Sequence, residues 1–205
     1  MNILANNYLT EDRISELLAK RVADPYVTPL REIASDAEPK PAAVLIPLLR
    51  QGEEWQLLYI LRARVEGDMH SAQVAFPGGR LDPGETSPQE AALREAREEI
   101  ALDTTGVRLL GLLEDFITIS NYRVTPVVGV IPWPTDLHPD PREVQRIFTI
   151  PLSWLADPSN WEQRERVAPN GQTVKVVYFK QYEKELLWGV TARITLNFLE
   201  ALELA

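Results

Sequence analysis

The chain has 205 residues, of which 45% are hydrophobic and 25% charged, a composition typical of a globular protein with one substantial core. With 21 Lys and Arg against 30 Asp and Glu, the net charge of −9 argues against a protein that binds a nucleic-acid backbone, so we expect no nucleic-acid partner. The lack of Cys excludes disulfides, thiol nucleophiles and thiolate metal sites, and two His leave little material for a His-based site.

The chain shows neither a membrane span nor a targeting signal. No stretch approaches the roughly 20 apolar residues that cross a bilayer. The first ten residues lack the charged segment and apolar run of a secretory signal. We therefore expect a soluble, cytoplasmic protein without membrane contact, and the sequence leaves a homodimer open.

The N-terminal part, residues 1–41, is predicted to be a helix and a connector that pack on the domain formed by residues 42–205. Apolar residues recur with helical spacing over Thr10–Ala23, and Pro25 follows. Arg31–Pro41 is rich in Pro and acidic residues, which favours a connecting loop.

Strand patterns dominate the middle of the chain. Ala42–Leu49 is apolar but contains Pro47, which predicts an interrupted or edge strand. A turn at Gln51–Glu54 and the apolar run Trp55–Leu61 complete a predicted hairpin. Later predicted strands are Leu109–Phe116, Val124–Ile131, Ile147–Ile150 and Thr173–Phe179, and the charged segment Trp161–Arg166 is interpreted as the approach to another hairpin.

Helices are predicted at Ser87–Leu102 and Thr191–Leu204, with a short helical turn at Ser153–Leu155. Strands in the middle and helices at both ends indicate one α+β domain, because regular βαβ alternation is missing.

The most informative segment is a glycine-rich loop, Phe76–Glu85, followed by a helix with clear start signals. Ser87 suits the N-cap, Pro88 the first helical position, and Glu90 completes a capping box. The sequence therefore predicts a tight loop that leads directly into a helix.

Three carboxylates share one edge of this predicted helix. At 100° per residue, Glu95, Glu98 and Glu99 fall within about 100° of one another, beside a separate apolar stripe. Because like charges four residues apart destabilise a helix, a hard divalent cation at this edge would be stabilising. The alternative is a solvated face, with Arg94 pairing to the acidic residues four positions away on either side.

The segment resembles the Nudix box, whose pattern is G-x5-E-x7-R-E-U-x-E-E-x-G-U with U an aliphatic residue. The matching residues are Gly79, Glu85, Arg94, Glu95, Ala96, Glu98, Glu99 and Leu102. Eight residues instead of seven separate Glu85 from Arg94, and Ala101 replaces the Gly. We expect Ala101 to alter how the helix ends and not the chemistry.

The resemblance implies an α/β/α sandwich around a mixed β-sheet and hydrolysis of a nucleoside diphosphate derivative with Mg²⁺ or Mn²⁺. It implies metal binding by Glu95, Glu98, Glu99 and the Gly79 carbonyl. An ion pair between Arg94 and Glu85 would orient these groups. Glu95 and Glu98 are the candidate general bases. Such a metal would neutralise the repulsion between an acidic protein and its polyanionic substrate.

The upstream sequence resembles the coenzyme A diphosphatase subfamily of Nudix enzymes, whose pattern is L-L-T-x-R-S-x3-R-x3-G-x3-F-P-G-G. Leu57, Leu58, Arg62 and Phe76–Gly79 agree with it in kind, with one extra residue before Arg62. Downstream, Val124–Gly129 and Trp188–Arg193 also look like that subfamily. The resemblance implies cleavage of coenzyme A, or a derivative of it, to 3′,5′-ADP and 4′-phosphopantetheine.

Three positions depart from the subfamily pattern, where Tyr59, Asp68 and Ala72 replace Thr, Arg and Gly. Asp68 matters most, because it would repel a phosphate that an Arg would bind. The residues expected near a phosphate-rich ligand are Arg62, Arg64, Arg80 and the loop glycines Gly78 and Gly79, with a plain surface Arg as the alternative for Arg64 and Arg80.

Two further residues are weaker candidates. His70 could contact the substrate, and Glu143 could add a carboxylate to the metal site, although solvent-exposed loop positions are the commoner interpretation of both. Other functions stay open: a Nudix hydrolase acting on a dinucleotide or a nucleotide sugar, or a Nudix-fold module that binds without cleaving.

Overall fold

The structure is a computed structural model, and it describes residues 9–20, 38–64, 72–168, 171 and 173–205. Asp68 and His70 lie outside these residues, as does most of the predicted connector Arg31–Pro41. Within the described ranges, no helix is long and apolar enough to cross a membrane.

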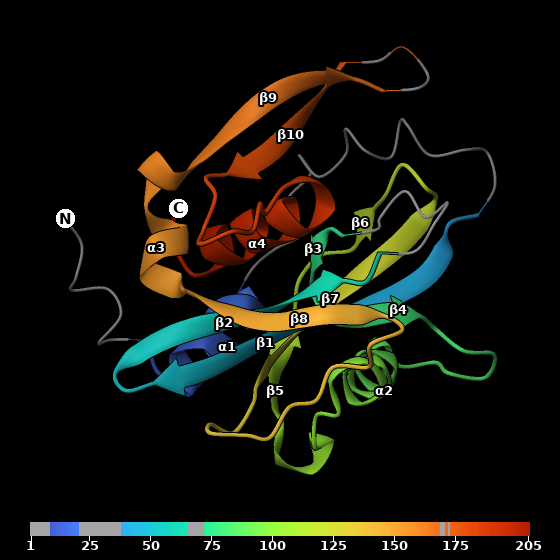
Figure 1. The fold of residues 1–205 in the computed structure, drawn as a ribbon, viewed down its shortest axis with the longest axis vertical. Coiled ribbons are helices and arrows are strands. Elements are labelled where there is room, and N and C mark those ends of the chain that lie inside the picture. Colours follow the sequence, from blue (N-terminus) through green and yellow to red (C-terminus); the bar gives the residue numbers. More distant parts are fainter. Residues whose placement is uncertain (1–8, 21–37, 65–71, 169–170, 172) are drawn as a thin grey trace.

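A mixed sheet forms the centre of the fold (Figure 1). Eight strands of the described residues contribute to it, in the order β3-β2-β1-β7-β5, while β4 pairs with β1, β6 with β7 and β8 with β2. They are β1 (Lys40–Gln51), β2 (Glu54–Arg62), β3 (Val74–Ala75), β4 (Gly78–Arg80), β5 (Arg108–Leu112), β6 (Phe116–Ile117), β7 (Tyr122–Val130) and β8 (Val144–Pro151). Strands β1 and β7 run parallel, and the other pairs are antiparallel.

Helices cover both faces of this sheet. Helix α2 (Pro88–Ile100) packs one face through Ala92, Ala96 and Ile100. The opposite core contains α1 (Glu11–Lys20), α3 (Leu152–Ala156) and α4 (Gly189–Ala201), together with a separate two-stranded ribbon of β9 (Trp161–Val167) and β10 (Thr173–Phe179). Single 3-10 turns lie at Thr104–Gly106 and Pro158–Asn160. The prediction of an α+β fold with an α/β/α sandwich is confirmed.

The prediction that Ala42–Leu49 forms an edge or interrupted strand is wrong. It is the centre of β1, a continuous strand with β7 on one side and both β4 and β2 on the other. Pro47 is tolerated because the ladder with β4 ends at Val44 and the ladder with β2 begins at Leu48. The Leu45 amide points to the side of β1 that carries β4 and β2, and it donates to the carbonyl of Pro77. Because backbone groups alternate along a strand, the Pro47 nitrogen points to the same side and lies in the gap between the two ladders.

The predicted single strand Leu109–Phe116 is divided into β5 and β6. Both pair with β7. The three residues 113–115 separate β5 from β6, whereas the partners of these strands on β7, Val127 and Val124, are separated by only two residues. One extra residue therefore interrupts the ladder, as in a bulge. The hairpin at Gly52 and the strands β7, β8 and β10 confirm the other strand predictions, β8 beginning earlier than expected.

Helix α1 packs on the edge strand β5. Leu18 lies against Gly111, where an added Cβ would be 3.1 Å from the Leu18 Cβ, and Ser15 Oγ donates to the Leu110 carbonyl at 2.7 Å. The helix thus shares the core of the sheet, and a division of the chain at residue 41 stays a prediction.

Candidate functional site

The glycines Gly78 and Gly79 lie in β4, between the central strand β1 and helix α2. A Cβ on Gly78 would lie 2.4 Å from the carbonyl oxygen of Ala43, and a Cβ on Gly79 would lie 2.3 Å from Oε1 of Glu95. Both distances are far below van der Waals contact, so a Cβ at Gly78 would collide with the backbone of β1, and a Cβ at Gly79 would displace the Glu95 carboxylate. The glycines therefore allow the carboxylates of α2 to approach the backbone of β4 directly.

Helix α2 starts where the sequence predicts. Ser87 is the N-cap, its Oγ accepts a hydrogen bond from the Glu90 amide at 3.4 Å, and Pro88 occupies the first turn. The turns that carry the carboxylates thus begin at a defined residue next to the glycine loop.

The end of α2 corrects the expectation about Ala101. This residue has φ 54°, the left-handed conformation that glycine usually provides, and its amide donates to the Ala96 carbonyl. Ala72, the other alanine that stands in place of a glycine, has φ 57°. Both alanines therefore adopt the left-handed conformation and carry the steric cost of a Cβ in that region.

We expect Ala101→Gly to raise the free energy of unfolding by about 0.5–1 kcal/mol, because relief of the left-handed strain exceeds the extra entropy of the unfolded glycine. Chemical denaturation of the variant beside the native protein measures this difference. Ala96→Gly in the same helix is the matched control, which should destabilise. An unchanged or lower stability of Ala101→Gly would contradict the prediction.

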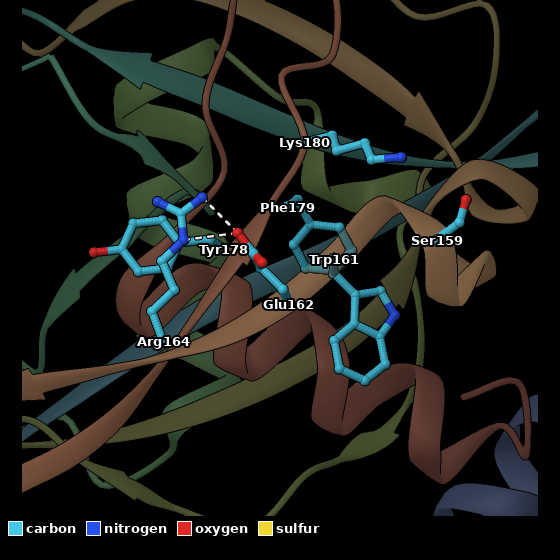
Figure 2. A pocket seen from close by; sticks show the side chains of 7 residues that line it. All are labelled: Ser159, Trp161, Glu162, Arg164, Tyr178, Phe179 and Lys180. Carbon is cyan, nitrogen blue, oxygen red and sulfur yellow. Dashed lines mark hydrogen bonds and ion pairs between the residues drawn. The ribbon is translucent and has the colours of Figure 1, made fainter.

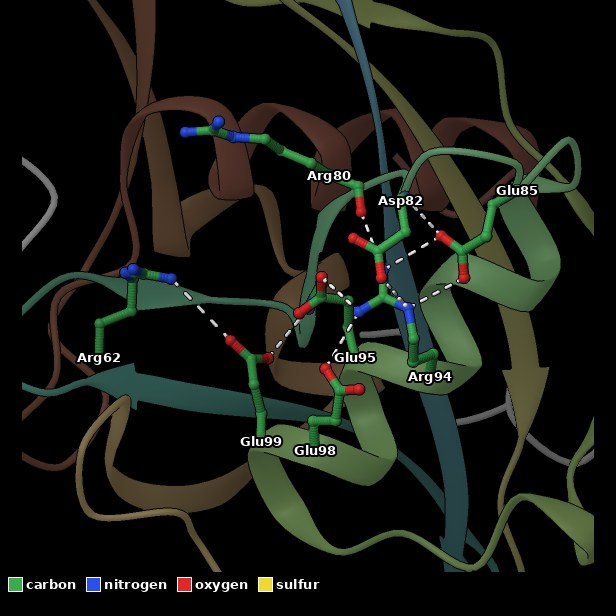
Figure 3. Close-up of polar contacts among 9 residues, drawn as sticks. Arg62, Arg80, Asp82, Glu85, Arg94, Glu95, Glu98 and Glu99 are labelled. Atoms are coloured by element: carbon green, nitrogen blue, oxygen red, sulfur yellow. Dashed lines mark hydrogen bonds and ion pairs between the residues drawn. The ribbon is translucent and has the colours of Figure 1, made fainter.

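Arg94 is the centre of an ion-pair network (Figure 3). Its Nε and Nη2 donate to the two carboxylate oxygens of Glu85 at 2.9 and 3.2 Å, and its Nη1 lies 3.0 Å from both Glu95 and Glu98. Nη2 also donates to the Arg80 carbonyl at 2.9 Å. The Glu85–Arg94 pair thus forms despite the extra residue between them, and hydrogen bonds from Arg94 lower the pKa of Glu85.

Glu99 is the most deeply buried carboxylate of the cluster, with 2% of its surface exposed. Its Oε2 accepts a hydrogen bond from the Gly78 amide at 3.0 Å, and its Oε1 lies 4.0 Å from Arg62 Nη1. Burial raises the pKa of the Glu99 carboxyl to about 8, although the Gly78 amide and Arg62 oppose this. Burial also raises the pKa of Glu95. Two carboxylates are therefore held beside β4 where ionisation is costly.

The other two acidic residues lie at the solvent side. The Glu98 side chain is 58% exposed and is tied to Arg94. Glu143 is exposed too, yet its charge raises the pKa of both Glu95 and Glu99. Its carbonyl accepts a hydrogen bond from the Ala63 amide at 2.8 Å, which holds the start of β8 beside the end of β2. No sequence signal distinguishes Glu143 from a solvated loop residue, because this contact is long-range.

The donor chemistry of the cluster fits a hard divalent cation. Carboxylate oxygens and a backbone carbonyl beside Gly79 are the ligands that Mg²⁺ and Mn²⁺ prefer. In the part of the chain that the structure describes, no three His, Asp or Glu side chains are already arranged as a metal cage. Arg94 occupies the space between Glu95 and Glu98, whereas Glu95 and Glu99 both adjoin the glycine strand.

The candidate phosphate-binding cations are arranged differently from one another. Arg62 faces Glu99, and Arg64 is exposed directly after β2. The Arg80 guanidinium lies over the ring of Tyr122, 5.4 Å from its centre, and points away from the carboxylates (Figure 3). Only Arg62 among these three makes a described contact with the carboxylate cluster through its side chain.

Tyr59, which departs from the subfamily pattern, is a packing residue. It is fully buried, its hydroxyl lies 3.0 Å from Thr195 Oγ1, and its ring stacks on Phe76 with 4.8 Å between ring centres. Because Phe76 directly precedes Pro77 and the two glycines, the packing of Tyr59 on Phe76 supports the glycine segment.

The raised pKa of Glu99 predicts a pH-dependent stability in metal-free protein. The folded protein binds this proton up to about pH 8, whereas the unfolded chain releases it near the ordinary value of 4.5. The free energy of unfolding should therefore fall as the pH rises between these values. Glu99→Gln should remove this component, on the order of 5 kcal/mol. Urea denaturation with a chelator at several pH values measures both proteins, and equal pH slopes would contradict the prediction.

Known proteins similar to this chain cover most of its length. The family model described as NUDIX domain matches residues 39–186. A protein named uncharacterized Nudix hydrolase NudL, from Photorhabdus laumondii subsp. laumondii, is 40% identical over 75% of this chain and 80% of its own length. A relative of the same name from Yersinia enterocolitica is 39% identical over 75% of this chain and 76% of its own length.

The fold has a counterpart among solved structures. A MutT/nudix family protein from Enterococcus faecalis superposes with a TM-score of 0.52, covering 94% of this chain and 74% of that chain at 14% identity. At this identity the likeness concerns the fold alone, while the family model and the relatives cover most of the chain. The chain therefore belongs to the Nudix hydrolase family and is an enzyme of the Nudix type.

Proposed function

We propose that this enzyme hydrolyses the diphosphate bond of coenzyme A or a derivative, with Mg²⁺ or Mn²⁺, to 3′,5′-ADP and 4′-phosphopantetheine or its acyl form. The observation that carries the proposal is the pair of carboxylates, Glu95 and Glu99, held against the Gly78–Gly79 backbone beside a guanidinium. The coenzyme A pattern in Leu57, Leu58, Arg62 and Phe76–Gly79 narrows the substrate class.

The residues of the site would have the following roles. Glu95, Glu99 and the Gly79 carbonyl would hold the cation, with Glu98 as a further ligand. When bound, the cation would neutralise charge on the diphosphate and lower the pKa of the attacking water. Arg94 positions Glu95 and Glu98, and Glu85 in turn positions Arg94.

A carboxylate beside the cation site would accept the proton of the attacking water. Glu95 and Glu98 remain candidates for this role, and the proximity of Glu143 to Glu95 and Glu99 adds a third. On the substrate side, Arg62, Arg64 and Arg80 would bind phosphate oxygens, with the ring of Tyr122 beneath Arg80. A cytoplasmic location stays a prediction from the sequence.

A substrate panel tests this function. The purified enzyme is supplied in turn with coenzyme A, a dinucleotide and a nucleotide sugar, each with Mg²⁺, Mn²⁺ or excess chelator, and the products are separated by chromatography. We expect the highest kcat/KM for coenzyme A, with 3′,5′-ADP as a product and no turnover in chelator. A higher kcat/KM for another diphosphate would assign that substrate class. Binding without cleavage of any compound would indicate a ligand-binding module.

The same assay tests the third candidate base. Glu143→Gln should lower kcat by about 10²–10⁴-fold with little change in KM if Glu143 accepts the proton. Glu162→Gln is the matched control, because Glu162 is also exposed but lies on β9. If Glu143→Gln has native kcat, Glu95 and Glu98 are left as the candidate general bases.

A further inference from the structure

The ribbon of β9 and β10 projects from the main sheet on the side of α4 (Figure 1). Strand β10 contacts α4, and β9 pairs with β10 along its whole length, Trp161↔Phe179 to Val167↔Thr173. No other strand of the described residues pairs with β9, so its second edge presents backbone donors and acceptors to solvent. Every residue from Glu162 to Val167 is exposed.

An exposed strand of seven residues favours the addition of another strand. We propose that the open edge of β9 is the interface with a second copy of this chain, which pairs its own β9 in antiparallel orientation. The two ribbons would form a continuous four-stranded sheet around a two-fold axis.

In the register that pairs all seven residues, the side chains of β9 are complementary in charge to those of β9 in the second copy. That register is centred on Arg164 and places Glu162 opposite Arg166 of the second copy, twice by symmetry. On the other face of the strand, Gln163 comes opposite Glu165 of the second copy. Opposite charges directly across a sheet stabilise strand pairing, whereas like charges oppose it.

The one like-charged pair, Arg164 with its own copy, is already compensated within each chain. Its Nε donates to Glu162 Oε1 at 2.7 Å, and its guanidinium lies 4.6 Å from the centre of the Tyr178 ring (Figure 2). Arg164 is therefore drawn back over β10 and paired with a carboxylate before the second copy arrives.

The proposed register also covers apolar surface at the two ends of β9. Val167 is 74% exposed, so its apolar surface faces solvent at the end of the strand. It comes opposite Trp161 of the second copy, which lines a pocket together with Ser159, Glu162, Arg164, Tyr178, Phe179 and Lys180 (Figure 2). Pairing would therefore bring an aliphatic side chain to the mouth of each pocket.

Charge reversal tests the interface and its register together. Sedimentation velocity over a range of protein concentrations should show a dimer for the native chain. Glu162→Arg and Arg166→Glu should each weaken self-association by about tenfold or more, because two attractive pairs become repulsive. An equimolar mixture of the two variants should dimerise again, since each charge then meets its opposite. The double variant E162R/R166E should also regain the dimer, because the glutamate that replaces Arg166 is again a same-face neighbour of Arg164 two residues away.

Lys184→Glu is the matched control. It makes the same charge change as Arg166→Glu, at an exposed position outside β9 and β10, and should leave the dimer intact. A native chain that stays monomeric at every concentration would overturn the proposal. So would single variants that dimerise like the native chain, or a mixture that fails to restore the dimer. Substrate turnover by each variant should stay native, because these residues lie outside the carboxylate site.

Discussion

Glu99→Gln is expected to reduce metal-dependent diphosphate hydrolysis by at least roughly 100-fold, because even the hydrogen-bond partners of metal ligands typically contribute 10–100-fold. Glutamine keeps the size of the side chain and an oxygen that can accept the Gly78 amide. It removes the carboxylate that Arg62 now faces at 4.0 Å and whose negative charge a divalent cation requires. Steady-state kinetics across a Mn²⁺ titration measures the loss.

The variant should fold normally and be more stable than the native protein at about pH 8 without metal, since a buried charge is gone. Glu90→Gln is the matched control, because it changes an exposed glutamate at the start of the same helix and retains a capping-box side chain. Native turnover by Glu99→Gln, or equal losses in both variants, would refute the assigned role of Glu99.

Replacing Gly78 by alanine should mainly lower stability, whereas replacing Gly79 by alanine should mainly lower activity. Gly78→Ala should lower the free energy of unfolding by about 3 kcal/mol, because its Cβ would meet the Ala43 carbonyl at 2.4 Å and the Val44 Cα at 2.6 Å. These atoms belong to the central strand β1 and cannot move aside without disturbing the sheet. Thermal denaturation and urea titration measure the change.

Gly79→Ala should instead lose activity with a smaller change in stability. Its Cβ would meet the carboxylate of Glu95 at 2.3 Å, and this end of a flexible side chain can rotate away. Displacing a proposed metal ligand should lower kcat/KM by roughly 10–100-fold. Equal stability losses in both variants would show that Gly79 serves packing alone, and a stable Gly78→Ala would contradict the close approach of β4 to β1.

Local chemistry made part of the fold predictable. Ser87, Pro88 and Glu90 specify the start of α2, since capping depends on residues within one turn. Helical spacing placed Glu95, Glu98 and Glu99 on one edge, because the period of an α-helix is fixed. The position of Pro47 in a central strand could not be predicted, because it depends on where the β4 and β2 ladders meet.

The candidate site, like the fold, was predictable from the sequence only in part. Composition and the order of residues determined that any metal here is bound by oxygen, and that glycines precede a carboxylate helix. Only the tertiary structure decided that Glu99 is buried against the Gly78 amide while Glu98 faces solvent, and that Arg62 and Glu143 approach the same carboxylates. Burial and electrostatic coupling depend on distances between residues far apart in the chain, so the sequence alone determined which groups are present and the packing decided which of them interact.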